Sequence, residues 1–186
     1  MVQDQESNLW ILDVGDNRKI RPYVTIYMID KNALQTQNKT ITVSRKIRFS
    51  YPDGPRNVEA AFFEGTYLYL VEKKVASDPK LAFIDISSDW GVIQIATECG
   101  IIPGLSSVTD ASVSPSGNVY ILTYFGVYQY NNATNQNKRS IKQLFSGDWK
   151  QAESLIALSD NNFFVGNEEG QIFQWKNGQF VDKYER

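Results

Sequence analysis

Apolar and polar residues alternate along most of this chain in short runs that are separated by turn-forming residues. Small and apolar residues at 58–63 are followed by the turn Glu64-Gly65-Thr66 and by an aromatic-rich run at 67–72. Period-two alternation bounded by Gly, Asn, Asp, Ser or Pro is typical of antiparallel strands joined by hairpins. No stretch of useful length has helical periodicity. The pattern therefore predicts an all-β protein.

This strand–turn–strand unit occurs three times. The units begin near Val58, Thr109 and Ala152, and each opens with an acidic residue, namely Glu59, Asp110 and Glu153. These acidic positions lie 51 and 43 residues apart, close to the ~40–50-residue period of a four-stranded propeller blade. Further strands with apolar alternation follow, for example 81–85 and 92–96 as the third and fourth strands of the unit that begins near Val58. The repeat predicts a β-propeller.

The N-terminal segment fits the same repeat from its second strand onward, so the chain is expected to start inside a blade. We predict one domain, 1–186, with approximate blades 8–50, 58–99, 108–146 and 152–186. This is a propeller-like fold of about three complete four-stranded antiparallel blades plus a partial N-terminal blade. It would form either a small closed ring, in which the C-terminal segment 180–184 completes the first blade, or an open fragment. An open fragment would favour a homo-oligomer, because it leaves sheet edges and blade faces uncovered.

Composition restricts the chemistry. The chain has no histidine and one cysteine, Cys99, which excludes Ser-His-Asp and Cys-His catalysis, multi-cysteine zinc sites and intrachain disulfides. A net charge of −2 and a pI near 5.2 argue against a nucleic-acid partner. No apolar stretch is long enough to span a bilayer, and the polar N-terminus predicts no signal peptide and no membrane insertion.

The aligned carboxylates of Glu59, Asp110 and Glu153 are the main candidate site. The first strand of each blade lines the channel of a propeller, so equivalent acids on successive blades would converge. Convergent carboxylates would suit a hard cation such as Ca²⁺ or a cationic ligand. Alternatively, each acid accepts backbone N–H bonds or pairs with a neighbouring lysine or arginine.

A second oxygen-rich group lies near the N-terminus. Asp13, Asp16 and Asn17 fall within five residues and would suit Ca²⁺, although the pattern lacks the ligand spacing of an EF-hand loop. The alternative is a local turn stabilised by Asp16 and Asn17, with Gly15 at positive φ.

Arginine and tyrosine residues supply further candidates. Arg18 and Arg21 would neutralise the nearby aspartates or bind an anion at the channel mouth. Tyr124 follows a strand end, where it either hydrogen-bonds a ligand or covers the sheet edge.

The stretch Asp13-Val14-Gly15-Asp16-Asn17-Arg18 resembles a motif of poorly characterised bacterial, often secreted, β-propeller-type proteins, which carry Gly-Asp-x-Gly-Asp-Asn. Further pieces of the resemblance are Val58-Glu59-Ala60 and Thr109-Asp110-Ala111, and it extends from about residue 8 to residue 175. It implies a propeller fold and an extracytoplasmic or secreted location. It implies no activity.

No catalytic residue can be assigned from the sequence. The pattern favours a non-enzymatic binding or interaction module whose partner, a small molecule or a protein, is unknown. The alternative is a Ca²⁺-dependent, hydrolase-like propeller that acts on phosphoesters or esters through the acidic channel residues.

Overall fold

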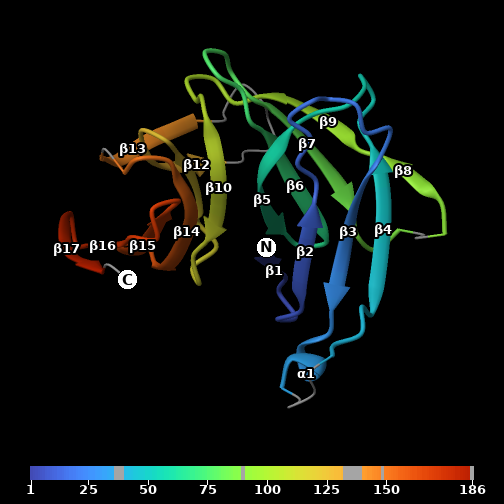
Figure 1. Ribbon diagram of the computed structural model, residues 1–186, viewed down its shortest axis with the longest axis horizontal. Coiled ribbons are helices and arrows are strands. Elements are labelled where there is room, and N and C mark those ends of the chain that lie inside the picture. Colours follow the sequence, from blue (N-terminus) through green and yellow to red (C-terminus); the bar gives the residue numbers. More distant parts are fainter. Residues whose placement is uncertain (36–39, 89–90, 132–139, 148, 185–186) are drawn as a thin grey trace.

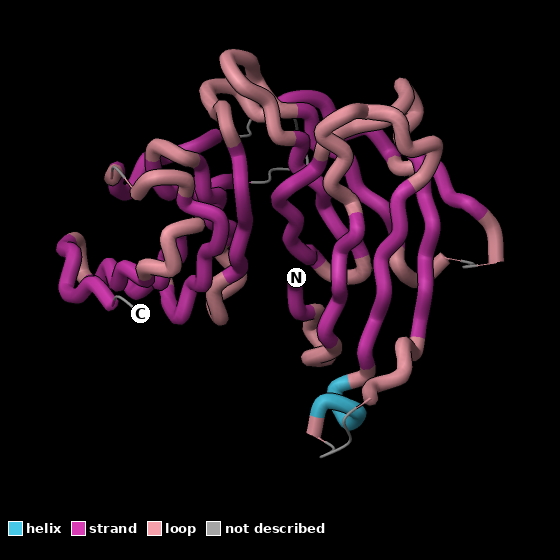
Figure 2. The backbone as a smooth tube through the Cα atoms, viewed as in Figure 1, coloured by secondary structure: helices cyan, strands magenta, loops and turns pink. Residues whose placement is uncertain are grey.

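The computed structural model describes residues 1–35, 40–88, 91–131, 140–147 and 149–184. In this part of the chain one short helix, α1 (Lys31–Leu34), accompanies strands and connecting loops (Figure 2). Asp30 caps the helix, since its carboxylate accepts a hydrogen bond from the backbone N–H of Asn32 at 2.8 Å. None of the described helical residues forms a segment long and apolar enough to cross a membrane.

The strands form four sheets that follow one another along the chain (Figure 1). The first sheet contains β1 (Val2–Gln3), β2 (Leu9–Asp13), β3 (Val24–Ile29), β4 (Arg45–Ser50) and β8 (Ile93–Ile95). The second contains β5 (Val58–Glu64), β6 (Tyr67–Glu72), β7 (Lys80–Asp85) and β9 (Thr97–Ile101). The third contains β10 (Val108–Val113), β11 (Val119–Thr123), β12 (Gly126–Asn131) and β13 (Ser140–Ser146). The fourth contains β14 (Ala152–Ser159), β15 (Asn162–Asn167), β16 (Ile172–Lys176) and β17 (Gln179–Tyr184).

These sheets are the blades of a four-bladed β-propeller, as the repeat predicts. Each of the last three blades starts with a tight hairpin between its first two strands. In the second blade Glu64 pairs with Tyr67, so the turn has two residues, and Gly65 adopts φ 61° there. Such a turn needs positive φ, which glycine adopts without steric cost.

The first blade differs from the prediction at its inner edge. Its first strand is present as β1, in which Val2 pairs antiparallel with Trp10 and Gln3 with Leu9. The C-terminal segment does not complete this blade, because β17 pairs with β16 in the fourth blade. The strand was missed because two residues are too few to show an alternation.

The outer strands of the first two blades also differ from the prediction. The segment around Ile93–Ile95 is β8, and it pairs parallel with β4 of the first blade. The fourth strand of the second blade is instead β9, which pairs with β7. Without β8 the outer edge of β4 would expose a row of unpaired N–H and C=O groups. By pairing with β4, β8 covers this sheet edge.

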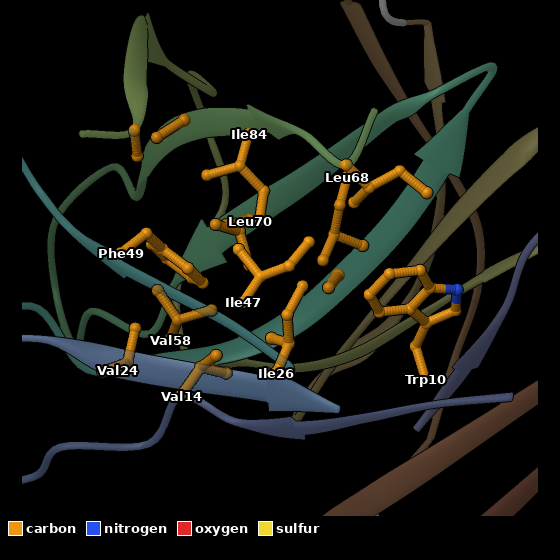
Figure 3. Packing of buried hydrophobic residues seen from close by; sticks show 14 of the residues in the cluster. Trp10, Val14, Val24, Ile26, Ile47, Phe49, Val58, Leu68, Leu70 and Ile84 are labelled. Carbon is orange, nitrogen blue, oxygen red and sulfur yellow. The ribbon is translucent and has the colours of Figure 1, made fainter. Parts of the chain in front are cut away.

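Three apolar clusters join successive blades. The first lies between blades one and two and includes Trp10, Ile26, Ile47 and Leu68, all fully buried (Figure 3). The second and third clusters lie between blades two and three and between blades three and four. Cys99 is a buried free thiol of the second cluster. Each inner blade is therefore packed on both faces.

The fourth blade is packed on one face only, as far as the structure describes it. Leu155 and Val165 are buried against the third blade. On the other face Ile156 pairs with Phe164, and Ile156 is 57% exposed. The first and fourth blades lie on opposite sides of Figure 1, with blades two and three between them.

Candidate functional site at the propeller centre

An open cavity of about 290 Å³ lies where the inner strands of the four blades meet. Its lining comes from all four blades: Met1, Val2, Leu12, Val14, Gly15, Val58, Glu59, Ala60, Ala61, Thr109, Asp110 and Glu153. The lining combines apolar walls with a few convergent polar groups, which is typical of a small-molecule site. The structure thus brings Glu59, Asp110 and Glu153 around one space.

Each inner strand of blades two to four carries a β-bulge at this cavity. In the second blade Val58 pairs with Glu72 and Ala60 with Val71, which leaves Glu59 as the additional residue. The same shift leaves Thr109 unpaired in the third blade and Glu153 in the fourth. A bulge re-aims the side chain it carries and is frequent next to functional sites. Here all three bulged residues line the cavity.

The bulges correct the sequence alignment by one residue. Thr109, and not Asp110, is the structural equivalent of Glu59 and Glu153. Asp110 is equivalent to Ala60 and Ser154 on the neighbouring blades. Matching the repeats by their acidic residues places Asp110 opposite Glu59 and Glu153. Matching them by the apolar residues that precede the bulges, Val58 and Val108, gives the correct register.

Asp110 is tied to the backbone. Its Oδ1 accepts from the N–H of Ala111 at 2.8 Å, and its Oδ2 accepts from the N–H of Leu155, on the next blade, at 2.8 Å. Burial raises the pKa of this carboxyl to about 6, because the loss of hydration outweighs the two backbone hydrogen bonds. Asp110 therefore has the alternative role predicted for these acids, in which the carboxylate accepts hydrogen bonds from backbone N–H groups.

A polar network links the cavity-lining residues Glu59 and Glu153. The Nζ of Lys73 lies 2.6 Å from Oε2 of Glu59 and 2.7 Å from the hydroxyl oxygen of Tyr124. The Tyr124 hydroxyl in turn donates to Oε1 of Glu153 at 3.1 Å. Burial lowers the pKa of Lys73, but the hydrogen bonds and charge of its partners outweigh this, and the pKa is raised. The network joins blades two, three and four. Of the two predicted roles for the acids, pairing with a neighbouring lysine applies to Glu59.

Burial lowers the pKa of Lys73 but raises that of Glu153. Loss of hydration raises the pKa of its carboxyl, against the lowering effects of the Lys73 charge and the Tyr124 hydrogen bond. Tyr124 is the middle link between Lys73 and Glu153, so its hydroxyl at this strand end bonds partners on both neighbouring blades.

The first blade joins the network through amide side chains. The Nδ2 of Asn57 donates to Oδ1 of Asn17 at 2.8 Å and to Oε1 of Glu59 at 2.9 Å. Its Oδ1 accepts from the N–H of Asp16 at 2.7 Å. Asn17 is thus linked to the central site, and Asn57 is a site residue that the sequence did not reveal.

The remaining predicted residues face elsewhere. Both oxygens of Asp13 accept from the Arg21 guanidinium, at 2.7 and 2.8 Å, and Asp16 Oδ2 accepts from the N–H of Arg21 at 2.8 Å. Hydrogen bonds from Arg21 lower the pKa of Asp13. Arg18 is exposed, and neither arginine lines the cavity.

The local-turn alternative is therefore the one that fits Asp16. Positive φ is found at Lys19 (52°) and not at Gly15, which corrects that expectation. Among the described residues, no three His, Cys, Asp or Glu side chains are grouped so that they would hold a metal ion. Neither Asp13 and Asp16 nor the channel carboxylates form such a group.

One buried hydroxyl of the site lacks a partner. Thr109 is 4% exposed, and its Oγ1 is a buried oxygen without a hydrogen bond to any described group. A buried hydroxyl without a partner costs roughly 1–3 kcal/mol. Thr109 is one of the residues that line the cavity, so the site contains a buried hydroxyl whose hydrogen bond is not met by any described group.

Comparison with known proteins identifies structural neighbours but no family. No protein-family model and no curated protein matches the chain. Solved structures do match the chain, among them the following two. One is a quinonprotein alcohol dehydrogenase-like protein from Bacteroides thetaiotaomicron, with 13% identity, a TM-score of 0.45 and 90% of this chain covered. The other is a protein from Lactobacillus plantarum, with 14% identity, a TM-score of 0.48 and 96% covered. The match spans 41% of the first chain and 67% of the second.

Proposed function

We propose that this protein is a non-enzymatic binding module of the propeller type, whose ligand site is the central cavity. One observation carries the proposal. Three successive blades use a bulge to aim Glu59, Thr109 and Glu153 into the same space. Local strand pairing is lost at each bulge, so the repetition needs a benefit outside the sheet, and a shared ligand supplies it.

The engagement of the carboxylates supports binding over catalysis. Glu59 is held by Lys73 and Asn57, and Asp110 by two backbone N–H groups. An acid or base that transfers protons must exchange its hydrogen-bond partner during the reaction. These groups are instead held in place, as residues that shape and charge a binding site are.

A thermal-shift screen with a library of small polar molecules tests the proposal. Compounds that bind the cavity should raise the Tm of the native protein by mass action. The same compounds should have no effect on Glu153→Arg, which fills the cavity and reverses a charge. Glu169→Arg, an exposed change on the same blade, is the matched control. A library without hits, or hits that shift all three proteins equally, would contradict the proposal.

The hydrolase alternative is tested in parallel. The native protein is assayed with p-nitrophenyl phosphate and p-nitrophenyl acetate in millimolar CaCl₂. We expect no turnover above that of the Glu59→Gln protein. Ca²⁺-dependent turnover that Glu59→Gln abolishes would make the protein an enzyme.

A further inference from the structure

The hydrogen-bonding and charge pattern of the cavity narrows the class of ligand, provided that the proposed binding function holds. The polar side chains of its lining are the carboxylates of Glu59, Asp110 and Glu153, which accept, and the unpartnered hydroxyl of Thr109, which can accept or donate. No lysine or arginine lines it. A ligand that fits this lining brings hydrogen-bond donors and positive charge.

The charge balance leads to the same conclusion. Lys73 does not line the cavity, but its ammonium group is hydrogen-bonded to Glu59, which does, and to Tyr124. The α-ammonium of Met1 lowers the pKa of Asp110, and Met1 also lines the cavity. Three carboxylates therefore face two positive charges. In a partly enclosed space an uncompensated carboxylate is costly, and a cation relieves that cost.

A metal ion fits the site less well than an organic cation. Asp110 directs both oxygens to backbone N–H groups, and Glu59 is bonded to Lys73 and Asn57. The described acids form no group of three suited to a metal. A primary ammonium instead offers three N–H donors on one atom. Glu153 and the Thr109 hydroxyl are acceptors in the same lining.

We infer that the cavity binds a small molecule through a primary ammonium group, with Glu153 as its counter-ion and the Thr109 hydroxyl as a second acceptor. The apolar lining from Val2, Leu12 and Val14 accommodates a short hydrocarbon chain attached to the nitrogen. The cavity of about 290 Å³ has room for a small ligand of this class.

The probe is n-butylammonium chloride, titrated at constant ionic strength and followed by amide NMR shifts. Its controls are n-butanol, which is neutral, sodium butyrate, which is anionic, and tetramethylammonium, which lacks N–H donors. We expect saturable shifts of residues around the cavity with n-butylammonium, and weaker or no binding of the other three. Glu153→Gln should weaken this binding about tenfold, and Glu169→Gln should leave it unchanged.

Thr109→Val separates a ligand contact from a structural role. Valine keeps the shape and removes an oxygen that has no partner in the free protein. The Tm should therefore stay equal or rise, while butylammonium binding weakens roughly two- to tenfold. A fall in Tm together with unchanged binding would overturn the role of Thr109.

The outcomes distinguish this inference from the proposed function. Saturable binding of butanol or butyrate at the cavity, or displacement of butylammonium by CaCl₂ at low concentration, overturns the ammonium class and leaves a binding module. Absence of saturable binding by any probe also overturns the inference. The library screen then decides independently whether the cavity binds anything.

Discussion

Thr109 and Asp110 are neighbours in the chain, yet they contribute to the site in different ways. Thr109 occupies the bulge position that holds glutamate in the second and fourth blades, and its hydroxyl is without a partner. Asp110 is bonded to two backbone N–H groups, one of them on the next blade. Thr109 thus has a buried hydroxyl without a hydrogen-bond partner, while Asp110 joins two blades.

The raised pKa of Asp110 predicts a specific dependence of stability on pH. The folded-state pKa of about 6 lies above the ordinary 3.8, so the fold favours the protonated acid. Asp110 therefore lowers the free energy of unfolding as pH rises from about 4 to about 6, by an amount on the order of 2–3 kcal/mol. Asp110→Asn cannot ionise and should lack this loss.

Urea unfolding of both proteins across this pH range tests the assignment. Other carboxyls, such as Asp13, have lowered pKa values and produce the opposite slope in both proteins, so the difference between the two curves is the measured quantity. A constant difference would mean that Asp110 titrates normally. Asn also leaves one N–H without an acceptor, which adds an offset that does not vary with pH.

At the residue scale, sequence reasoning located the carboxylates but not their alignment. Glu59 and Glu153 were identified because each opens a recognisable strand. Thr109 and Asn57 were missed because a hydroxyl or an amide has no distinctive pattern in one sequence. What makes Thr109 notable is a missing hydrogen bond, a property that exists only once the chain is folded.

Within one strand, two adjacent residues give a direct test of how the fourth blade is packed. Leu155 is 4% exposed and lies in the third cluster, whereas Ile156 points the other way and is 57% exposed. Leu155→Ala should cost about 2–5 kcal/mol, because it leaves a cavity. Ile156→Ala should cost well under about 1 kcal/mol. Equal losses in urea unfolding would show that the outer face is covered in solution.

Two hairpins are joined by a carboxylate at the border of the third and fourth blades. Asp160, in the β14–β15 turn, accepts from the hydroxyls of Ser114 at 2.6 Å, Ser116 at 2.7 Å and Tyr120 at 2.9 Å. These bonds hold the pKa of Asp160 well below its usual range. Because a lowered pKa contributes stability above the ordinary pKa, that stability is lost as the carboxylate is protonated in strong acid.

Asp160→Asn should therefore lower the Tm at neutral pH, since the amide nitrogen faces hydroxyl donors. Asp85→Asn is the matched control. Asp85 also accepts turn hydrogen bonds, from the N–H and hydroxyl of Ser87, but within one blade. Differential scanning calorimetry should show a larger fall for Asp160→Asn. A larger fall for Asp85→Asn would mean that the hairpin contact contributes little.

Strand existence was easier to predict than strand partnership. The alternation at 92–96 indicated a strand correctly, but it carries no information about which sheet edge the strand joins. In the structure β8 extends the first blade, and β9 completes the second. Pairing depends on which edge lies within reach after the turn at Asp85, and this is a property of the three-dimensional arrangement.

For the molecule as a whole, the repeat predicts neighbour-to-neighbour packing, and the three apolar clusters follow that rule. How the ends of the series behave could not be predicted, because it depends on the twist between sheets and not on any one residue. The first blade ends in an outer strand taken from the next connection, while the fourth blade leaves Ile156 and Ile172 exposed.

This asymmetry predicts a gradient of local stability. Every residue of β11 is buried between two blades, whereas in β15, the equivalent strand of the fourth blade, only Phe163 and Val165 are buried. When a blade contacts only its neighbours, its stability is its own plus that of its interfaces, so a blade with one interface opens at lower free energy. Native-state amide exchange should therefore show weaker protection in β15 and β16 than in β6 and β11. Equal protection in all four strands would mean that the outer face of the fourth blade is covered in solution, by the first blade or by a second molecule. Measuring the exchange at several protein concentrations separates these two cases, since only the contact between molecules depends on concentration.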